Sequence, residues 1–172
     1  MEVNCFLRPV KIPNQDRSMT LQWTSTMSGN ETRIFRGKLI AGILKRSTWK
    51  DDAHGELNGH MVRFKTKGFW KRSTQILDIE GTKELGHIEY HSWKSTATIT
   101  YEEESYEFSF DSWTRKAWKI HNGEGQAIYS KPSVWKNKGD IEVENISPPI
   151  ILAGLFVYSY FQRMAAAVAA ST

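Results

Sequence analysis

Five histidines are the first candidates for chemistry in this 172-residue chain, and two of them are spaced as metal ligands often are. His87 and His91 are four residues apart, with Glu89 between them. On a helix this spacing would bring both imidazoles to one ion. The surrounding residues are typical of a strand, where four residues span about 13 Å. We therefore predict solvent-exposed side chains on one face of a strand and no metal site.

The other chemistry-bearing residues lack the context that their chemistry requires. Asp51, Asp52 and His54 are polar neighbours at the start of a predicted strand, with no nucleophile and base recognisable beside them. The G-x-G in "NGEG", residues 122–125, belongs to a predicted turn and opens no helix, so it does not predict a nucleotide site. Cys5 has no neighbour that would activate its thiol. We predict neither enzymatic activity nor a cofactor.

A tryptophan followed by a lysine occurs five times, which accounts for five of the seven tryptophans. The pairs are Trp49-Lys50, Trp70-Lys71, Trp93-Lys94, Trp118-Lys119 and Trp135-Lys136. Each interval holds about two strands with their turns, so the pairs should recur at related heights, one in each hairpin. Trp93 lies an even number of residues before the apolar residues of "TATITY", and alternate residues of a strand share one face. We therefore predict that Trp93 faces inward and that Lys94 faces outward.

Basic residues near these pairs are candidates for binding an anionic lipid head group. If they gather at one rim of the fold, each would add about 1 kcal/mol of attraction to an anionic membrane surface. Tryptophan at such a rim would also suit a membrane interface. The predicted contributors are Lys45, Arg46, Lys65, Lys67, Lys71 and Arg72. The alternative is that the tryptophans pack the core and the lysines solvate the outside.

The elements that must position these residues are mostly short antiparallel strands. "HMVRFKTK", "TATITY" and "SYEFSF" alternate apolar and polar residues with a period of two. Turn residues separate such runs over residues 37–145, and Asn58-Gly59 is the strongest hairpin signal. Before them, "NCFLRPV", "MTLQWTST" and "ETRIFRGKLI" predict two or three more strands.

One apolar helix is predicted over about residues 148–170. Ser147 is the predicted N-cap, and the two prolines that follow suit a first helical turn, where their missing N–H groups are not needed. The apolar residues of this helix go all the way round it and leave no polar face, so it must be enclosed by protein or by lipid. The twelve residues from Ile150 to Phe161 carry no charge, and Gln162 and Arg163 then interrupt the apolar segment, which favours a buried core helix over a membrane span.

These elements predict a mostly β, single-domain fold over residues 1–172, with strands over about residues 1–145. In a closed antiparallel meander barrel that encloses the helix, the sheet and the helix would cover each other's apolar surfaces. Closure would also remove the exposed edges of the sheet. Two alternatives stay open. The helix could anchor the β domain in a membrane, or the lumen could be empty and bind a small ligand, as in lipocalins.

The charge balance is mildly basic, with 23 Lys and Arg against 19 Asp and Glu and a net charge of +4. This favours anionic surfaces but is below the charge density of a dedicated nucleic-acid arm, so nucleic acid is not expected as a partner. The single cysteine cannot form an intrachain disulfide, and "MEVNCFLRPV" has no basic stretch followed by an apolar run. We expect a cytoplasmic protein, with peripheral membrane association as the alternative.

The order of these elements resembles the Tubby C-terminal-like superfamily, which includes phospholipid scramblase-like and LURP-one-related proteins. The likeness rests on the Trp-Lys hairpins, on "GELNGHMVRFKTKGFWK" and "ILDIEGTKELGHIEY", and on the terminal apolar helix. It covers most of the chain and is weakest over the first 35 residues. The resemblance implies a closed barrel of about twelve strands around a hydrophobic C-terminal helix, and membrane or phosphoinositide association for some members.

We therefore expect a non-enzymatic binding module that associates with anionic phospholipid or phosphoinositide through a basic surface. A protein-interaction or structural barrel is one alternative. A β domain anchored in a membrane by its C-terminal helix is the other.

Overall fold

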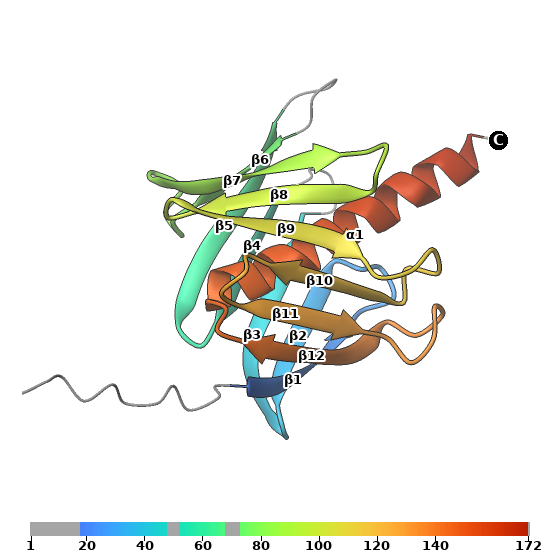
Figure 1. Ribbon diagram of the computed structural model, residues 1–172, viewed down its shortest axis with the longest axis horizontal. Coiled ribbons are helices and arrows are strands. Elements are labelled where there is room, and N and C mark those ends of the chain that lie inside the picture. The colour runs from blue at the N-terminus through green and yellow to red at the C-terminus, as the bar shows by residue number, and fades with distance from the viewer. Residues whose placement is uncertain (1–17, 48–51, 68–72, 172) are drawn as a thin grey trace, which may run out of the picture.

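The computed structural model describes residues 18–47, 52–67 and 73–171. Within these residues, twelve strands and one helix follow one another (Figure 1). The strands are β1 (Ser18–Ser25), β2 (Glu31–Arg36), β3 (Leu39–Arg46), β4 (Asp52–Leu57), β5 (His60–Lys67), β6 (Ser73–Leu77), β7 (Glu84–His91), β8 (Thr96–Tyr101), β9 (Glu104–Phe110), β10 (Ala117–His121), β11 (Gln126–Ser130) and β12 (Lys138–Glu144). The helix is α1 (Pro148–Ala170).

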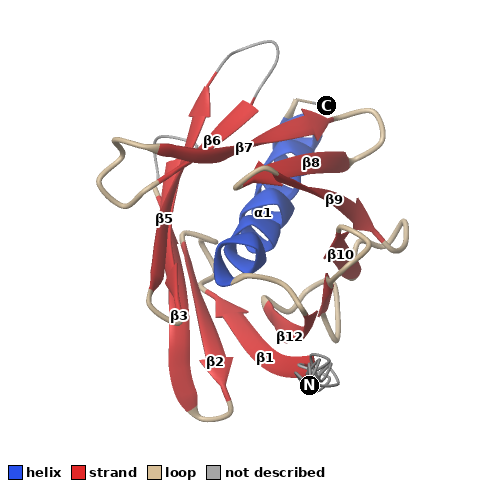
Figure 2. Cartoon of the chain, turned by 60° about the vertical axis from the view of Figure 1, so that its left-hand side comes forward, coloured by secondary structure: helices blue, strands red, loops and turns tan. Residues whose placement is uncertain are grey.

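The strands form a closed barrel in which each strand pairs with its neighbours in sequence. β1 completes the barrel by pairing antiparallel with β12, from Ser18 opposite Glu144 to Thr24 opposite Lys138. Because every described strand has a partner on both sides, the barrel presents no open strand edge for another chain to extend. Figure 2 shows α1 enclosed between the opposite walls. The predicted closed meander around a C-terminal helix is confirmed.

Side-chain alternation decides which face of each strand turns inward. In β8, Ala97, Ile99 and Tyr101 are buried, while the threonines between them are partly exposed. β9 buries Tyr106 and Phe108 in the same way. The period of two predicted for these segments is confirmed, and it supplies the apolar lining of the lumen.

Two-residue turns join several of the strands. Asn58 and Gly59 have φ values of 51° and 82°, the left-handed backbone that a type I′ hairpin requires. Glu102 and Glu103 make the β8–β9 turn with φ values of 47° and 71°. The hairpin predicted at Asn58-Gly59 is confirmed, whereas "NCFLRPV" lies outside the described residues.

α1 begins at Pro148, directly after Ser147, as predicted. The side chain of Ser147 makes no capping hydrogen bond. Its carbonyl oxygen instead accepts hydrogen bonds from the N–H groups of Ile150 and Ile151, at 3.1 and 3.2 Å. The two prolines occupy the first helical positions, where a missing N–H leaves no bond unmade.

The first half of α1 fills the barrel. Twelve residues between positions 149 and 161 are buried, and Ile151, Leu155 and Tyr158 are 1%, 2% and 8% exposed. The lumen is therefore occupied by protein, which excludes the empty lumen that a small-ligand barrel of lipocalin type requires. From Gln162 onward the helix is mostly exposed, so the enclosed-helix prediction holds for its first half only.

Aromatic rings join α1 to opposite walls of the barrel. Phe156 stacks on Phe64 of β5, with ring centroids 4.7 Å apart. Tyr158 stacks on Trp118 of β10, with centroids 3.8 Å apart. Because ring stacking holds the helix on both sides, its position and direction inside the barrel are fixed.

Close approach of α1 to β11 depends on Gly154. A Cβ atom at this position would lie 2.4 Å from the hydroxyl oxygen of Tyr129. That hydroxyl donates a hydrogen bond to the carbonyl oxygen of Ile151 at 2.9 Å. Burial raises the pKa of Tyr129, so the phenol stays protonated and remains a donor.

Candidate functional site

The histidines considered as metal ligands lie along one outward-facing side of β7. Nε2 of His87 is 4.0 Å from Oε1 of Glu89, and His91 is exposed on the same side of the strand. Within the residues that the structure describes, no three His, Cys, Asp or Glu side chains are grouped so that they could hold a metal ion. Cys5 and Asp51 lie outside the described residues.

Of the four predicted head-group residues that the structure describes, three are exposed on the wall and Arg46 is buried. Lys45 and Arg46 are consecutive on β3 and therefore point to opposite sides of the wall. Lys45 is exposed, and its Nζ lies 4.0 Å from Oε2 of Glu31. Arg46 is only 8% exposed, and its guanidinium carbon lies 4.9 Å from the centre of the Phe156 ring. Arg46 thus makes a cation–π contact with the helix inside the barrel mouth.

Lys65 and Lys67 are exposed on the outer face of β5. They are two residues apart, so both side chains leave the same side of the sheet. Lys71 and Arg72, the other two predicted residues, lie outside the described residues. The wall therefore offers Lys45, Lys65 and Lys67 to solvent.

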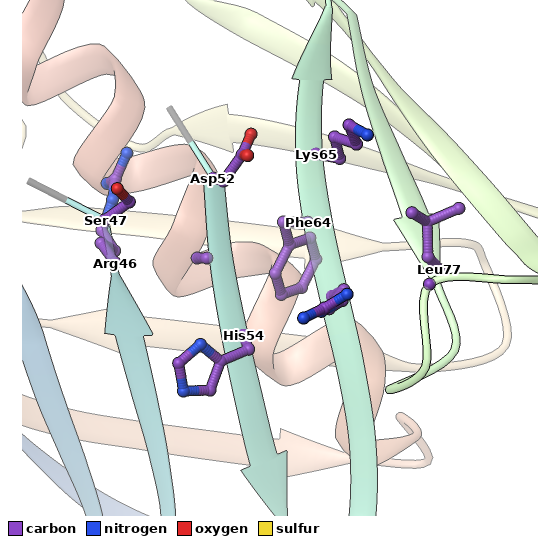
Figure 3. Close-up of a pocket in the computed structure, with 10 residues that line it drawn as sticks. Arg46, Ser47, Asp52, His54, Phe64, Lys65 and Leu77 are labelled. Atoms are coloured by element: carbon purple, nitrogen blue, oxygen red, sulfur yellow. The ribbon is translucent and has the colours of Figure 1, made fainter. Parts of the chain in front are cut away.

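A pocket of about 340 Å³ is hollowed in the wall formed by β3 to β6 (Figure 3). Its polar lining combines three cations, Arg46, Arg63 and Lys65, with Asp52, His54 and Ser47. The Asp52 carboxylate accepts a hydrogen bond from the backbone N–H of Thr66 at 3.3 Å, and it lies opposite Lys65 in the strand register. Three cationic side chains share the pocket with this one carboxylate, so the lining carries a net positive charge.

Trp93 does not face inward, so the orientation predicted for it is wrong: its side chain is fully exposed. Trp93 lies in the connection between β7 and β8, and Ser95 in that connection has a positive φ of 52°. A left-handed residue breaks the alternation of side chains, so parity counted back from Ala97 does not carry to Trp93. Trp118 lies inside β10 and is buried, as the core-packing interpretation predicts.

Three tryptophans are exposed, each in a connection that follows an odd-numbered strand. Trp93 lies between β7 and β8, Trp113 between β9 and β10, and Trp135 between β11 and β12, with exposures of 103%, 93% and 90%. In an antiparallel meander, the connections that follow odd-numbered strands all lie at one end of the barrel. Figure 1 shows these three at its right-hand end. We name this end, defined by these three residues, the tryptophan rim.

A turn that begins at a serine presents each rim tryptophan. In each turn a backbone N–H donates to the carbonyl oxygen three residues earlier. These bonds run from Ser95 to Ser92 (3.3 Å), from Arg115 to Ser112 (3.1 Å) and from Lys136 to Ser133 (3.2 Å). The indole is carried by the second or third residue of the turn and so projects from the end of the barrel.

Two basic side chains connect the turns of the rim to their surroundings. Nη2 of Arg115 donates a hydrogen bond to Oγ of Ser95 at 3.0 Å and so links the β9–β10 connection to the β7–β8 connection. Nζ of Lys131 donates to the carbonyl oxygen of Val134 and to the hydroxyl of Tyr158, both at 3.1 Å. The β11–β12 connection is thereby joined to α1.

The two ends of the barrel carry opposite charge. The described connections at the rim end hold five cations and one carboxylate, a net charge of +4, from Lys94, Arg115, Lys116, Lys131 and Lys136 against Asp111. The connections at the other end hold two cations and five carboxylates, a net charge of −3, from Lys38 and Lys83 against Asp78, Glu80, Glu102, Glu103 and Glu124. The rim is therefore the end that attracts an anionic surface.

Hydrogen bonds keep one of the carboxylates at the acidic end ionised. Asp78 accepts bonds from the backbone N–H groups of Lys83 and Thr82, at 3.1 and 2.7 Å, and from the Thr82 hydroxyl at 2.8 Å. The backbone N–H of Lys83 contributes most to lowering the pKa of Asp78 below its usual value. Asp78 therefore keeps its contribution to the negative charge of this end in mildly acidic solution.

α1 leaves the barrel through the tryptophan rim (Figure 1). At the exit, Nε2 of Gln162 donates a hydrogen bond to the Tyr158 hydroxyl at 2.8 Å. Beyond it the helix is mostly exposed, and Val168 is 63% exposed. By length and composition α1 could cross a membrane, although 61% of its most apolar window is buried inside the barrel.

The rim was not predicted from the sequence as a group. Trp113 is not followed by lysine and so falls outside the Trp-Lys pattern, and the orientation predicted for Trp93 is wrong. A signal was present: a serine lies one or two residues before each rim tryptophan, in "SWK", "SWT" and "SVWK", within runs of turn-forming residues. That context favours a turn over a strand at each of the three positions.

No protein-family model, curated protein or solved structure matches this chain. The resemblance to the Tubby C-terminal-like superfamily therefore stays a prediction based on the order of elements.

Proposed function

We propose that this barrel is a non-enzymatic module that docks on anionic phospholipid surfaces through the tryptophan rim. The observation that carries the proposal is the coincidence, in the described connections at one end of the barrel, of three exposed indoles and a net charge of +4, with −3 at the other end. Indole rings favour the membrane–water interface, and each cation near an anionic bilayer adds about 1 kcal/mol of attraction. Together these properties bind the barrel and orient it.

The proposal places the main contact at the end of the barrel, and the wall residues take secondary roles. Lys67 is exposed at the end of β5, on the rim side, and can add to the attraction. Lys45 and Lys65 point outward from the wall one and two residues before the rim-side ends of β3 and β5, so they would approach a lipid surface if the barrel tilts. Arg46 supports α1 from within. Anionic phospholipid and phosphoinositide share the negative head group that this arrangement recognises.

Sedimentation with vesicles tests the proposal. The full chain is expected to sediment with phosphatidylcholine vesicles that contain phosphatidylserine, and much less with phosphatidylcholine alone. Lys94→Glu/Lys136→Glu should weaken binding by about 30-fold or more, because losing two cations removes roughly 2 kcal/mol of attraction and the two new carboxylates add repulsion. The matched control is Lys38→Glu/Lys83→Glu, which changes net charge equally at the acidic end and should have a much smaller effect.

The indoles are tested by the triple variant Trp93→Ser/Trp113→Ser/Trp135→Ser. All three side chains are exposed, so the fold should be retained while vesicle affinity falls by about tenfold or more. Absence of sedimentation of the unaltered chain at low salt would contradict the proposal. So would a loss caused by Lys65→Glu/Lys67→Glu but not by the rim variants. Binding to a single-stranded oligonucleotide without binding to vesicles would instead assign the rim to base stacking.

A further inference from the structure

We infer that the exposed end of α1 inserts into the acyl region of the leaflet on which the barrel docks, while the barrel stays at its surface. We name residues 164–170 the helix tip. The inference rests on the proposed docking function and adds to it a second, apolar contact. It is carried by the change in polarity along α1 and by the direction in which the helix leaves the barrel.

Polarity along α1 changes in three steps. The first step is apolar and buried, up to Phe161. The second is a polar band at the exit, formed by Gln162 and Arg163 on the helix and by Lys131 of the β11–β12 connection, which donates to the Tyr158 hydroxyl. The third is the helix tip, which contains no charged residue. A bilayer surface presents the same sequence of environments, a polar head-group layer followed by hydrocarbon.

The helix tip is apolar on every side. It consists of Met164 and Val168 with five alanines, and every tip residue except Met164 is exposed. A helix without a polar face must be enclosed by something apolar. The high helix propensity of alanine keeps this segment helical without packing against the barrel, so it can meet lipid as a formed helix.

The dimensions suit a single leaflet. Nine residues from Gln162 to Ala170 extend about 13 Å at 1.5 Å per residue, against a hydrocarbon core of about 30 Å. With Gln162 and Arg163 at head-group level, where long polar side chains can reach water, the described part of the tip stays within the near leaflet. The rim tryptophans would then lie at the interface beside it.

Lipid is the occupant that the surroundings of the tip favour. The tip emerges at the end of the barrel that carries the three exposed indoles and the net charge of +4 (Figure 1). An anionic bilayer attracted by that charge meets the tip first. Stacking of Phe156 on Phe64 and of Tyr158 on Trp118 holds the helix in that direction. Docking and insertion therefore use the same end of the molecule.

Two variants of the full chain that leave its net charge unchanged separate insertion from electrostatic docking. Ala167→Gln/Val168→Gln makes the tip polar, and Ala167→Leu/Val168→Leu makes it more apolar at the same positions. At about 0.5 M NaCl, where the Debye length is about 4 Å, rim attraction is screened and the apolar contact dominates. We expect binding to anionic vesicles to weaken about tenfold with the Gln pair and to strengthen about tenfold with the Leu pair.

An environment-sensitive fluorophore on Ala170→Cys, in a Cys5→Ser background, reports where the tip lies. Its emission should shift to the blue on vesicles, whereas the same label on Glu103→Cys, at the acidic end, should keep its aqueous emission. If the tip label stays aqueous on bound protein, or if both tip variants bind as the unaltered chain does, insertion is wrong while docking stands. A vesicle-free dimer that the Gln pair dissociates would assign the tip to a second copy and overturn the inference. Failure of the unaltered chain to bind at low salt would instead overturn docking itself.

Discussion

The Lys131 ammonium donates a hydrogen bond to the Tyr158 hydroxyl at 3.1 Å, across the mouth of the barrel. Lys131 directly follows β11, and Tyr158 belongs to the buried half of α1. The same ammonium donates to the Val134 carbonyl oxygen at 3.1 Å. One buried cation therefore joins the connection that carries Trp135 to the central helix, and the rim and the helix exit form one structural unit.

Lys131→Met keeps the aliphatic stem and removes the ammonium. The Val134 carbonyl then loses its partner, so the free energy of unfolding should fall by about 1–3 kcal/mol in urea titrations. The amide of Lys136, which closes the turn at Trp135, should lose hydrogen-exchange protection, whereas the amide of Arg115 should not. Lys136→Met is the control, because it makes the same chemical change at an exposed site and should alter stability by less than about 0.5 kcal/mol. Equal effects of both variants would contradict the role given to Lys131.

Gly154→Ala should destabilise the barrel although alanine favours a helix by about 1 kcal/mol over glycine. The new methyl group would lie 2.4 Å from the Tyr129 hydroxyl oxygen and 2.7 Å from Cδ1 of Ile120, so the packed interior must move. We expect a net loss of about 1–3 kcal/mol in the free energy of unfolding.

Tyr129→Phe removes the oxygen that Gly154→Ala meets first, so the double variant should cost less than the sum of the single changes. A double-mutant cycle measures this coupling. A stabilised Gly154→Ala variant would show that helix propensity outweighs the close approach and would contradict the packing described here.

Asp78→Ala should give a pH-dependent loss of stability in the turn between β6 and β7. The pKa of Asp78 is lowered in the fold from an ordinary value of 3.8, chiefly by the backbone N–H of Lys83. Its stabilising contribution is therefore fully present above about pH 4 and is lost as the pH falls through the folded pKa. The melting temperature of the variant should lie below that of the unaltered chain at pH 7, and the gap should narrow as the pH falls below about 4.

Glu80→Ala is the control for this measurement, since it removes one exposed carboxylate from the same connection. It should produce no gap of similar size. A difference for Asp78→Ala that stays constant down to about pH 2 would contradict the hydrogen-bonding account.

Periodicity in the sequence is enough to predict most of this fold. The alternation in "TATITY", the Asn58-Gly59 turn and the prolines after Ser147 each correspond to the structure found there, because strand, hairpin and helix start depend on local sterics and hydrogen bonding. The point at which α1 leaves the barrel was not predicted. Gln162 and Arg163 were interpreted as an interruption of a core helix, and they mark the exit from it.

The candidate site was harder to predict, because it depends on where strands stop. Trp93 and Trp118 each precede a lysine, yet one is fully exposed and the other fully buried. Trp118 lies one residue inside β10, whereas Trp93 lies in a turn that contains a left-handed Ser95. A dipeptide does not encode that difference. The neighbouring turn residues do, through the backbone conformations that they allow.

Docking orientation is measured most directly by comparing two labelled positions at opposite ends of the barrel. Spin labels on Thr114→Cys, beside Trp113 in the rim, and on Glu103→Cys, in the β8–β9 turn, would be read in a Cys5→Ser background. On anionic vesicles, the label at position 114 should become shielded from a water-soluble relaxation agent and accessible to oxygen dissolved in the bilayer. The label at position 103 should remain exposed to water. Shielding at position 103, or unchanged exposure of both labels on vesicle-bound protein, would contradict docking through the tryptophan rim.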